Sequence, residues 1–144
     1  MNAAQPRPAS SASSPLTILA FDFGTRRIGV AMGSTVLRQA RPLTTLAHGG
    51  TPPWDDIGRL IAEWEAGALV VGVPLHPDGA EHEMTHKARR FARQLGGRYR
   101  LPVHEVDERY SSVEAQAGGA SPGNLDAAAA AIILDQFFAN TSPS

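Results

Sequence analysis

One short stretch, residues 68–75 with the sequence ALVVGVPL, constrains the fold more than any other part of the chain. It carries no charged side chain, so a strand formed from it must be covered on both faces, as in the centre of a parallel sheet. Apolar residues recur at helical spacing from Trp54 to Trp64 before this stretch and from Met84 to Tyr99 after it. A sheet with helices packed on its faces is therefore predicted.

The other predicted elements complete an α/β fold. Residues 16–23 and 26–33 are two β-prone runs joined by a Gly-Thr turn, which predicts a hairpin. A third strand is predicted near 43–47 and a further strand over 102–106, followed by a largely buried helix over 125–138. Hairpin strands followed by alternating helices and strands predict a mixed sheet with helices on both faces.

The composition excludes several classes of site. The chain has no cysteine, which excludes disulfides, thiolate metal sites and thiol nucleophiles and fits a cytosolic protein. The formal net charge of -1 gives no overall attraction to nucleic acid or to anionic membranes, so such binding would need a local cationic patch. We find no apolar run long enough for a membrane span.

The two ends of the chain differ in composition from the rest. Residues 1–15 are mostly Ser, Ala and Pro with no apolar face, which predicts a flexible tail without a signal peptide. Residues 139–144 are predicted to fray. One domain is therefore expected, over residues 16–138.

Three acidic residues fall where strands end or where the last helix begins. Asp22 ends the first strand, Glu108 follows the last strand, and Asp126 opens the final helix. The carboxyl ends of parallel strands meet at one edge of a sheet, where open α/β proteins bind ligands. Carboxylates brought together there repel one another unless a cation neutralises them, and hard divalent cations prefer oxygen ligands. The pattern indicates a divalent-metal site suited to phosphodiester hydrolysis.

Each acid also has a simpler interpretation. Asp22 can accept hydrogen bonds from the turn that follows it. Asp126 can cap the final helix, where a negative charge is favourable. Glu108 can form a surface ion pair with Arg109. The metal hypothesis therefore depends on the convergence of all three acids.

Four blocks of the sequence together resemble one known family. They are LAFDFGTRRIGVAMG, VVGVPLHPDGAEHE, VHEVDERYSSVEA and LDAAAAAIIL. In order and spacing they are similar to the motifs of the YqgF-type proteins, bacterial RNase H-like proteins associated with Holliday junction resolution and with pre-16S rRNA processing. The resemblance covers about residues 16–138.

This resemblance implies a five-stranded RNase H-like sheet and a metal-dependent endonuclease. Its catalytic and metal-binding acids would be Asp22, Glu108 and Asp126, with Mg²⁺ or Mn²⁺ as the cofactor. It also implies a cytoplasmic hydrolase that processes the 5′ end of 16S rRNA during ribosome biogenesis. Cleavage of branched DNA as a Holliday junction resolvase is the alternative.

Further residues are candidates for substrate binding. Arg26 and Arg27 lie on the predicted hairpin beside Asp22, where cations would contact phosphates. Lys87 and Arg90 belong to a cationic run with Arg89 and Arg93 that is equally explained as a solvated helix face. The block VHEVDERYSSVEA adds three further candidates: Arg109, Ser111 and Ser112. The resemblance implies that they contact the scissile phosphate, and an equally good interpretation is that they are turn and helix-capping residues. The expected partner is precursor rRNA or branched DNA, and no association with a membrane is expected. The protein is expected to act as a monomer or a homodimer.

Two other functions remain open from the sequence. The DFGT motif at 22–25 also resembles the phosphate-binding hairpin of sugar and acetate kinases, although those enzymes need a second lobe. Residues 116–124 replace a longer, often basic insert of the YqgF-type family, which puts the grip on substrate in doubt because phosphate contacts would be lost. A non-catalytic nucleic-acid-binding or ribosome-assembly module is therefore the third possibility.

Overall fold

The computed structural model describes residues 16–75, 78, 80–81, 83–107 and 122–140. The predicted tail at 1–15 lies outside this part of the chain, as do residues 141–144 of the predicted frayed end. Residues 139 and 140 belong to the last helix. Within the described residues, no helix has the length and apolar character needed to cross a membrane.

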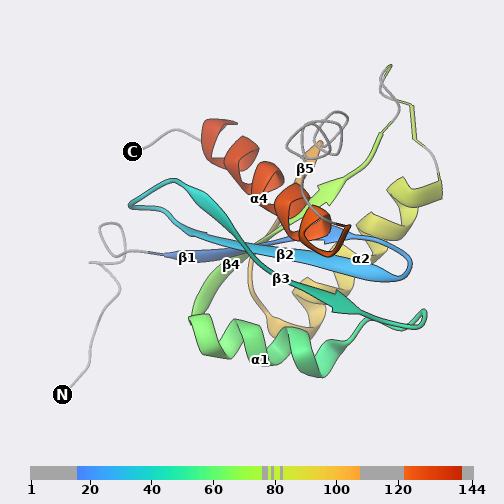
Figure 1. Ribbon diagram of the computed structural model, residues 1–144, viewed down its shortest axis with the longest axis horizontal. Helices are drawn as coiled ribbons and strands as arrows, with labels where there is room; N and C mark the ends of the chain where they lie inside the picture. The colour runs from blue at the N-terminus through green and yellow to red at the C-terminus, as the bar shows by residue number, and fades with distance from the viewer. Residues whose placement is uncertain (1–15, 76–77, 79, 82, 108–121, 141–144) are drawn as a thin grey trace.

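Five strands form one sheet in the order β3-β2-β1-β4-β5 (Figure 1). Their bounds are Thr17–Phe23 (β1), Arg27–Ser34 (β2), Ala40–Ala47 (β3), Ala66–Val73 (β4) and Val103–Asp107 (β5). β1, β2 and β3 form an antiparallel meander, whereas β1, β4 and β5 run parallel. The mixed sheet predicted from the sequence is confirmed, and its third strand starts earlier than expected.

Helices cover both faces of this sheet, as predicted. They are α1 (Trp54–Trp64), α2 (Glu83–Tyr99) and α4 (Pro122–Asn140). Figure 1 shows α4 on one face of the sheet and α1 on the opposite face. The side chains of β1 alternate between two cores: Leu19 and Phe21 pack in the core that includes residues of α1 and α2, and Ile18 and Ala20 pack against α4. Cover on both faces explains why β1 is apolar almost throughout.

The same alternation decides where the last residues of β1 point. Asp22 continues the series of Ile18 and Ala20, so it belongs to the α4 face. Phe23 continues the series of Leu19 and Phe21 and packs against the opposite core. The end of β1 therefore supplies a carboxylate to one face of the sheet and an aromatic ring to the other.

Candidate active site at the end of the first strand

A glycine lies between the strand that carries the first predicted acid and the helix that carries the last one. Asp22 is half-buried near the end of β1, and its partner across the β1–β2 ladder is Gly29. A Cβ atom at Gly29 would lie 1.9 Å from the backbone oxygen of Asp126. Only a residue without a side chain lets α4 approach β2 this closely. Because cross-strand partners project from the same face, Asp22 and Asp126 adjoin Gly29 on the α4 face.

Asp126 lies inside α4 and not at its start. The helix begins at Pro122, so the prediction that Asp126 opens it is wrong by about one turn. A capping residue stands before the first helical turn, and capping therefore does not explain this carboxylate. Its Oδ2 instead accepts a 2.7 Å hydrogen bond from Nε of Arg27.

The two arginines of the hairpin have different surroundings. Arg27, the first residue of β2, is paired with Asp126, so its guanidinium is engaged within the protein. Arg26 lies in the turn, is exposed, and forms no ion pair with another residue of the described chain. Of the two predicted phosphate contacts, Arg27 is therefore the one with a carboxylate partner among the described residues.

His48 holds the hairpin turn in place, a role that sequence reasoning missed. Its backbone N–H donates to the oxygen of Arg26 at 2.9 Å, and its ring Nε2 lies 2.8 Å from the oxygen of Gly24. Its Nδ1 accepts from the N–H of Gly50 at 3.2 Å. Because Nδ1 accepts from Gly50, Nε2 is the ring nitrogen that donates to the oxygen of Gly24. In the sequence His48 is a single histidine before two glycines, and no local pattern predicts its contacts with the turn.

The remaining candidates come from the block that follows β5. They lie outside the described residues: Glu108, Arg109, Ser111 and Ser112. β5 ends at Asp107, immediately before the predicted acid, at the carboxyl end of the parallel strands. Among the residues that are described, no three His, Asp or Glu side chains gather into a metal-binding group. The described part of the site therefore consists of two acids and one arginine.

Lys87 and Arg90 lie away from the two acids. Both project from α2 into a groove that is also lined by Phe23 and Thr25. Phe23 belongs to the face of the sheet opposite to Asp22, so the sheet separates these cations from the acids. The predicted substrate-binding residues are therefore divided between two surfaces that meet at the β1–β2 turn.

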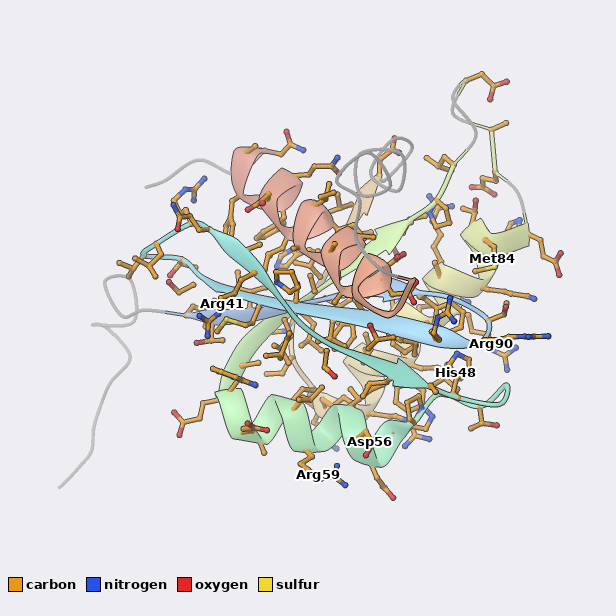
Figure 2. All side chains as sticks on the ribbon, viewed as in Figure 1. Arg41, His48, Asp56, Arg59, Met84 and Arg90 are labelled. Atoms are coloured by element: carbon orange, nitrogen blue, oxygen red, sulfur yellow. The ribbon has the colours of Figure 1, made fainter. Side chains whose placement is uncertain are left out.

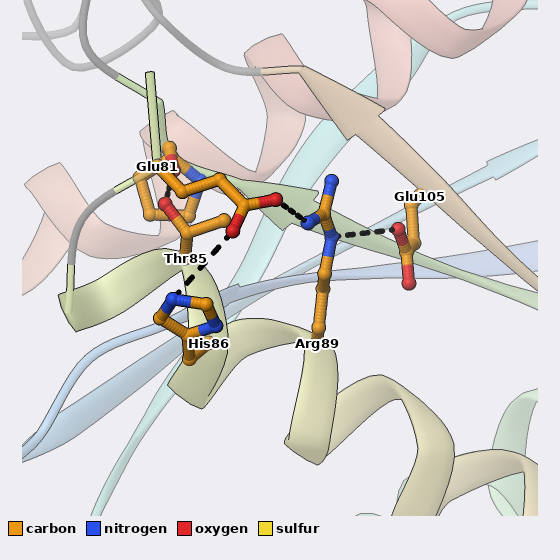
Figure 3. Close-up of polar contacts among 6 residues, drawn as sticks. Glu81, Thr85, His86, Arg89 and Glu105 are labelled. Atoms are coloured by element: carbon orange, nitrogen blue, oxygen red, sulfur yellow. Dashed lines mark hydrogen bonds and ion pairs between the residues drawn. The ribbon is translucent and has the colours of Figure 1, made fainter. Parts of the chain in front are cut away.

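Arg89, from the same cationic run, is engaged within the protein (Figure 3). Its Nη1 donates to Glu81 at 2.5 Å and its Nε lies 3.4 Å from Glu105 of β5. The hydrogen bond to Glu81 is the main cause that raises the pKa of the Arg89 guanidinium above its usual value. Beside it, the buried Thr85 donates its hydroxyl to the oxygen of Pro74. Arg89 thus ties α2 to β5 and to the segment after β4.

The sheet order, with an antiparallel meander followed by two parallel strands and helices on both faces (Figure 1), is that of an RNase H-like fold. Among solved structures, "T. thermophilus RuvC in complex with Holliday junction substrate" matches with a TM-score of 0.50 and 16% identity, covering 85% of this chain and 93% of that chain. At this identity the likeness shows the fold alone. The predicted RNase H-like fold is confirmed.

Sequence comparisons define the family. A family model described as "RuvX: Holliday junction resolvase" matches residues 16–140. A Paraburkholderia phytofirmans protein named "Putative pre-16S rRNA nuclease" is 55% identical over 126 residues, which cover 84% of this chain and 86% of that protein. A Ralstonia pickettii protein of the same name is 54% identical over 138 residues, or 92% and 96% of the two chains. The chain belongs to the RuvX family, the YqgF-type proteins that its motifs resemble.

Proposed function

We propose that this protein is a metal-dependent endonuclease that hydrolyses phosphodiester bonds during 5′ end processing of pre-16S rRNA. The observation that carries the proposal is that Gly29 pairs with Asp22 across the β1–β2 ladder and also lies against the backbone of Asp126. Acids that adjoin in this way repel one another and are suited to a shared cation. Relatives more than 50% identical carry the name "Putative pre-16S rRNA nuclease", which supports this substrate.

The donor chemistry fits a hard divalent cation. Asp22 and Asp126 supply carboxylate oxygens on one face of the sheet, and Glu108 would complete the set from the segment after β5. The guanidinium of Arg27 already places one positive charge beside the carboxylate of Asp126. Bound Mg²⁺ or Mn²⁺ would supply activation of water and stabilisation of the leaving oxygen.

The surrounding residues would orient the acids and the substrate. Arg27 holds the Asp126 carboxylate in one orientation through its Nε donor. Arg26, exposed on the turn that His48 clamps, would contact a phosphate next to the scissile bond. We further propose phosphate contacts from the block that follows β5, by Arg109, Ser111 and Ser112.

Cleavage of branched DNA is the second candidate function. It is favoured by the description of the matching family model as a Holliday junction resolvase. Phosphate contacts position both kinds of nucleic acid without reading their sequence, so the two functions would use the same acids. In either case we propose a cytoplasmic enzyme that acts as a monomer or a homodimer.

A cleavage assay tests the function and separates the two substrates. Purified protein is incubated with a pre-16S rRNA 5′ fragment or a four-way DNA junction, in Mg²⁺, Mn²⁺ or EDTA. We expect metal-dependent cutting of the RNA, and loss of cutting to background in Asp22→Asn. Asp55→Asn is the matched control, because Asp55 is exposed on α1, on the opposite face of the sheet. Equal cutting by Asp22→Asn and the parent protein would refute the proposal.

A further inference from the structure

A second surface lies on the other side of β1 from the two acids. It is a groove of about 500 Å³ between α2 and the loop that joins β3 to α1. Phe23 and the buried Phe91 contribute to its lining, together with Thr25 of the β1–β2 turn. Figure 2 shows His48 and Arg90, which both line the groove, at the same end of the molecule.

One wall of the groove is a row of hydrogen-bond donors. Lys87, Arg90, Gln94 and Arg98 follow one another at helical spacing along α2, over roughly 16 Å at 1.5 Å per residue. No acidic side chain is present among the described residues that line this groove. Lys87 forms an exposed pair with Glu83 at 3.2 Å, whereas Arg90 is exposed without an ion pair to any residue of known position. This wall is suited to a polyanion.

The lining of the groove also provides aromatic rings. The ring of Phe23 stacks on that of His48 with a centroid distance of 5.9 Å and an interplanar angle of 27°. Phe23 also contacts Phe91, at 4.8 Å between centroids. Both ring nitrogens of His48 are held by backbone groups, so the Phe23–His48 pair is a fixed stacking surface. Rings beside a row of cations are the pattern by which proteins bind unpaired nucleotides.

We propose that this groove, called here the flank groove, binds a single-stranded RNA segment that adjoins the cleavage site. Phosphates would lie on Lys87 and Arg90, and a base would extend the stack that Phe23 and His48 form. Phe23 directly follows Asp22, and Thr25 lines the groove from the turn, so a strand leaving the acids reaches the groove over that turn. A duplex does not offer its base faces in this way, which favours an unpaired segment. The inference rests on the proposed nuclease function.

Binding measured without cleavage provides the main test. Fluorescence anisotropy with a labelled eight-nucleotide RNA in EDTA gives the dissociation constant of each variant. We expect Phe23→Leu to weaken binding about fivefold or more, because it removes the aromatic stack that a base would extend. Arg90→Gln should weaken it too and should reduce the slope of log affinity against log salt by about 0.7.

Two matched controls lie away from the groove. Arg41→Gln removes a charge that is also exposed, on β3, and Figure 2 shows Arg41 far from His48 and Arg90. Phe137→Leu truncates a partly buried ring on the α4 face. Thermal unfolding of all four variants shows whether Phe23→Leu is folded. If Phe23→Leu is unfolded, Arg90→Gln still tests the groove, because Arg90 is exposed. Equal affinities for Arg90→Gln and Arg41→Gln would overturn the proposal.

Two further arms separate this inference from the nuclease itself. The protein could cut the rRNA fragment while its RNA affinity does not change in Arg90→Gln or Phe23→Leu. That result would overturn RNA binding by the flank groove and leave the nuclease function standing. Groove-dependent RNA binding without any cutting would support the groove while the nuclease function failed. A DNA oligonucleotide of the same sequence forms the last arm, and tighter groove-dependent binding of DNA would overturn the assignment to RNA.

Discussion

Arg27 and Asp126 lie 99 residues apart in the chain and are joined by a 2.7 Å hydrogen bond from Nε to Oδ2. The bond links β2 to α4 beside Gly29, where the helix backbone touches the strand. The side chains are 53% and 24% exposed, so solvent screening limits the stability the pair provides to less than about 1 kcal/mol. Its main effect is to fix the orientation of one proposed metal ligand.

Replacement of Arg27 should therefore affect activity more than stability. We expect Arg27→Gln to lower metal-dependent cleavage by roughly 10-fold to 100-fold, as loss of a group that orients a ligand does. The free energy of unfolding in urea should change by less than about 1 kcal/mol. Arg41→Gln is the charge-matched control. Unchanged cleavage in Arg27→Gln would show that Arg27 does not position Asp126.

Gly29 should be intolerant of even one added methyl group. A Cβ atom there would overlap the backbone of Asp126, which cannot move as a flexible side chain can. We expect Gly29→Ala to destabilise the protein by about 3 kcal/mol or more and to separate α4 from β2, with loss of cleavage. Chemical denaturation measures the first effect.

A second glycine gives the opposite expectation and serves as the control. Gly97 lies in α2, and a Cβ atom there would meet nothing within 4 Å. Gly97→Ala should stabilise the protein by about 0.5–1 kcal/mol, because alanine loses less backbone entropy in a helix. Equal effects of the two substitutions would contradict the close approach of Asp126 to Gly29.

Magnesium should stabilise the folded protein by binding to the proposed ligands Asp22 and Asp126. If 10 mM Mg²⁺ is about ten times its dissociation constant, binding adds about 1.4 kcal/mol, visible as a rise in the thermal midpoint. We expect this rise in the parent protein and in Asp55→Asn, its loss in Asp22→Asn, and its reversal by EDTA. The readout needs no cleavage, so it tests the metal site apart from the substrate. An equal rise in Asp22→Asn would exclude Asp22 as a ligand.

Local patterns were sufficient to predict the architecture. The apolar run at 68–75 required a strand covered on both faces, and β4 lies inside the sheet between β1 and β5. The rule that ligands gather at strand ends also pointed to Asp22. The last helix was predicted to start at residue 125 but starts at Pro122, because proline is favourable in the first turn of a helix.

The details of the site depend on contacts that no local pattern contains. The pairing of Arg27 with Asp126 spans almost the whole domain. Gly29 is one residue of a β-prone run in the sequence, and only the folded chain places the backbone of α4 against it. His48 acts through backbone groups of the distant turn at Gly24, which only the folded meander brings within reach.

Tyr99 should make stability depend on pH in the alkaline range. Its hydroxyl donates a 2.7 Å hydrogen bond to the backbone oxygen of Trp54, and burial raises its pKa above the usual value, with the charge of Arg98 acting in the opposite direction. Because the folded state favours the protonated phenol, this contribution is present below the unfolded pKa of about 10. It is lost as the pH rises through the higher folded pKa. Tyr99→Phe removes the hydrogen bond and should cost about 1 kcal/mol at pH 8.

The difference in free energy of unfolding between the parent protein and Tyr99→Phe should therefore shrink as the pH rises from 8 to 11. Urea unfolding at several pH values measures it, and comparison of the two proteins at each pH cancels the titration of all other groups. The hydrogen bond joins the end of α2 to the start of α1, so its loss should also loosen the end of the flank groove near Arg98. A difference that stays constant across this range would show that ionisation of Tyr99 is not coupled to folding.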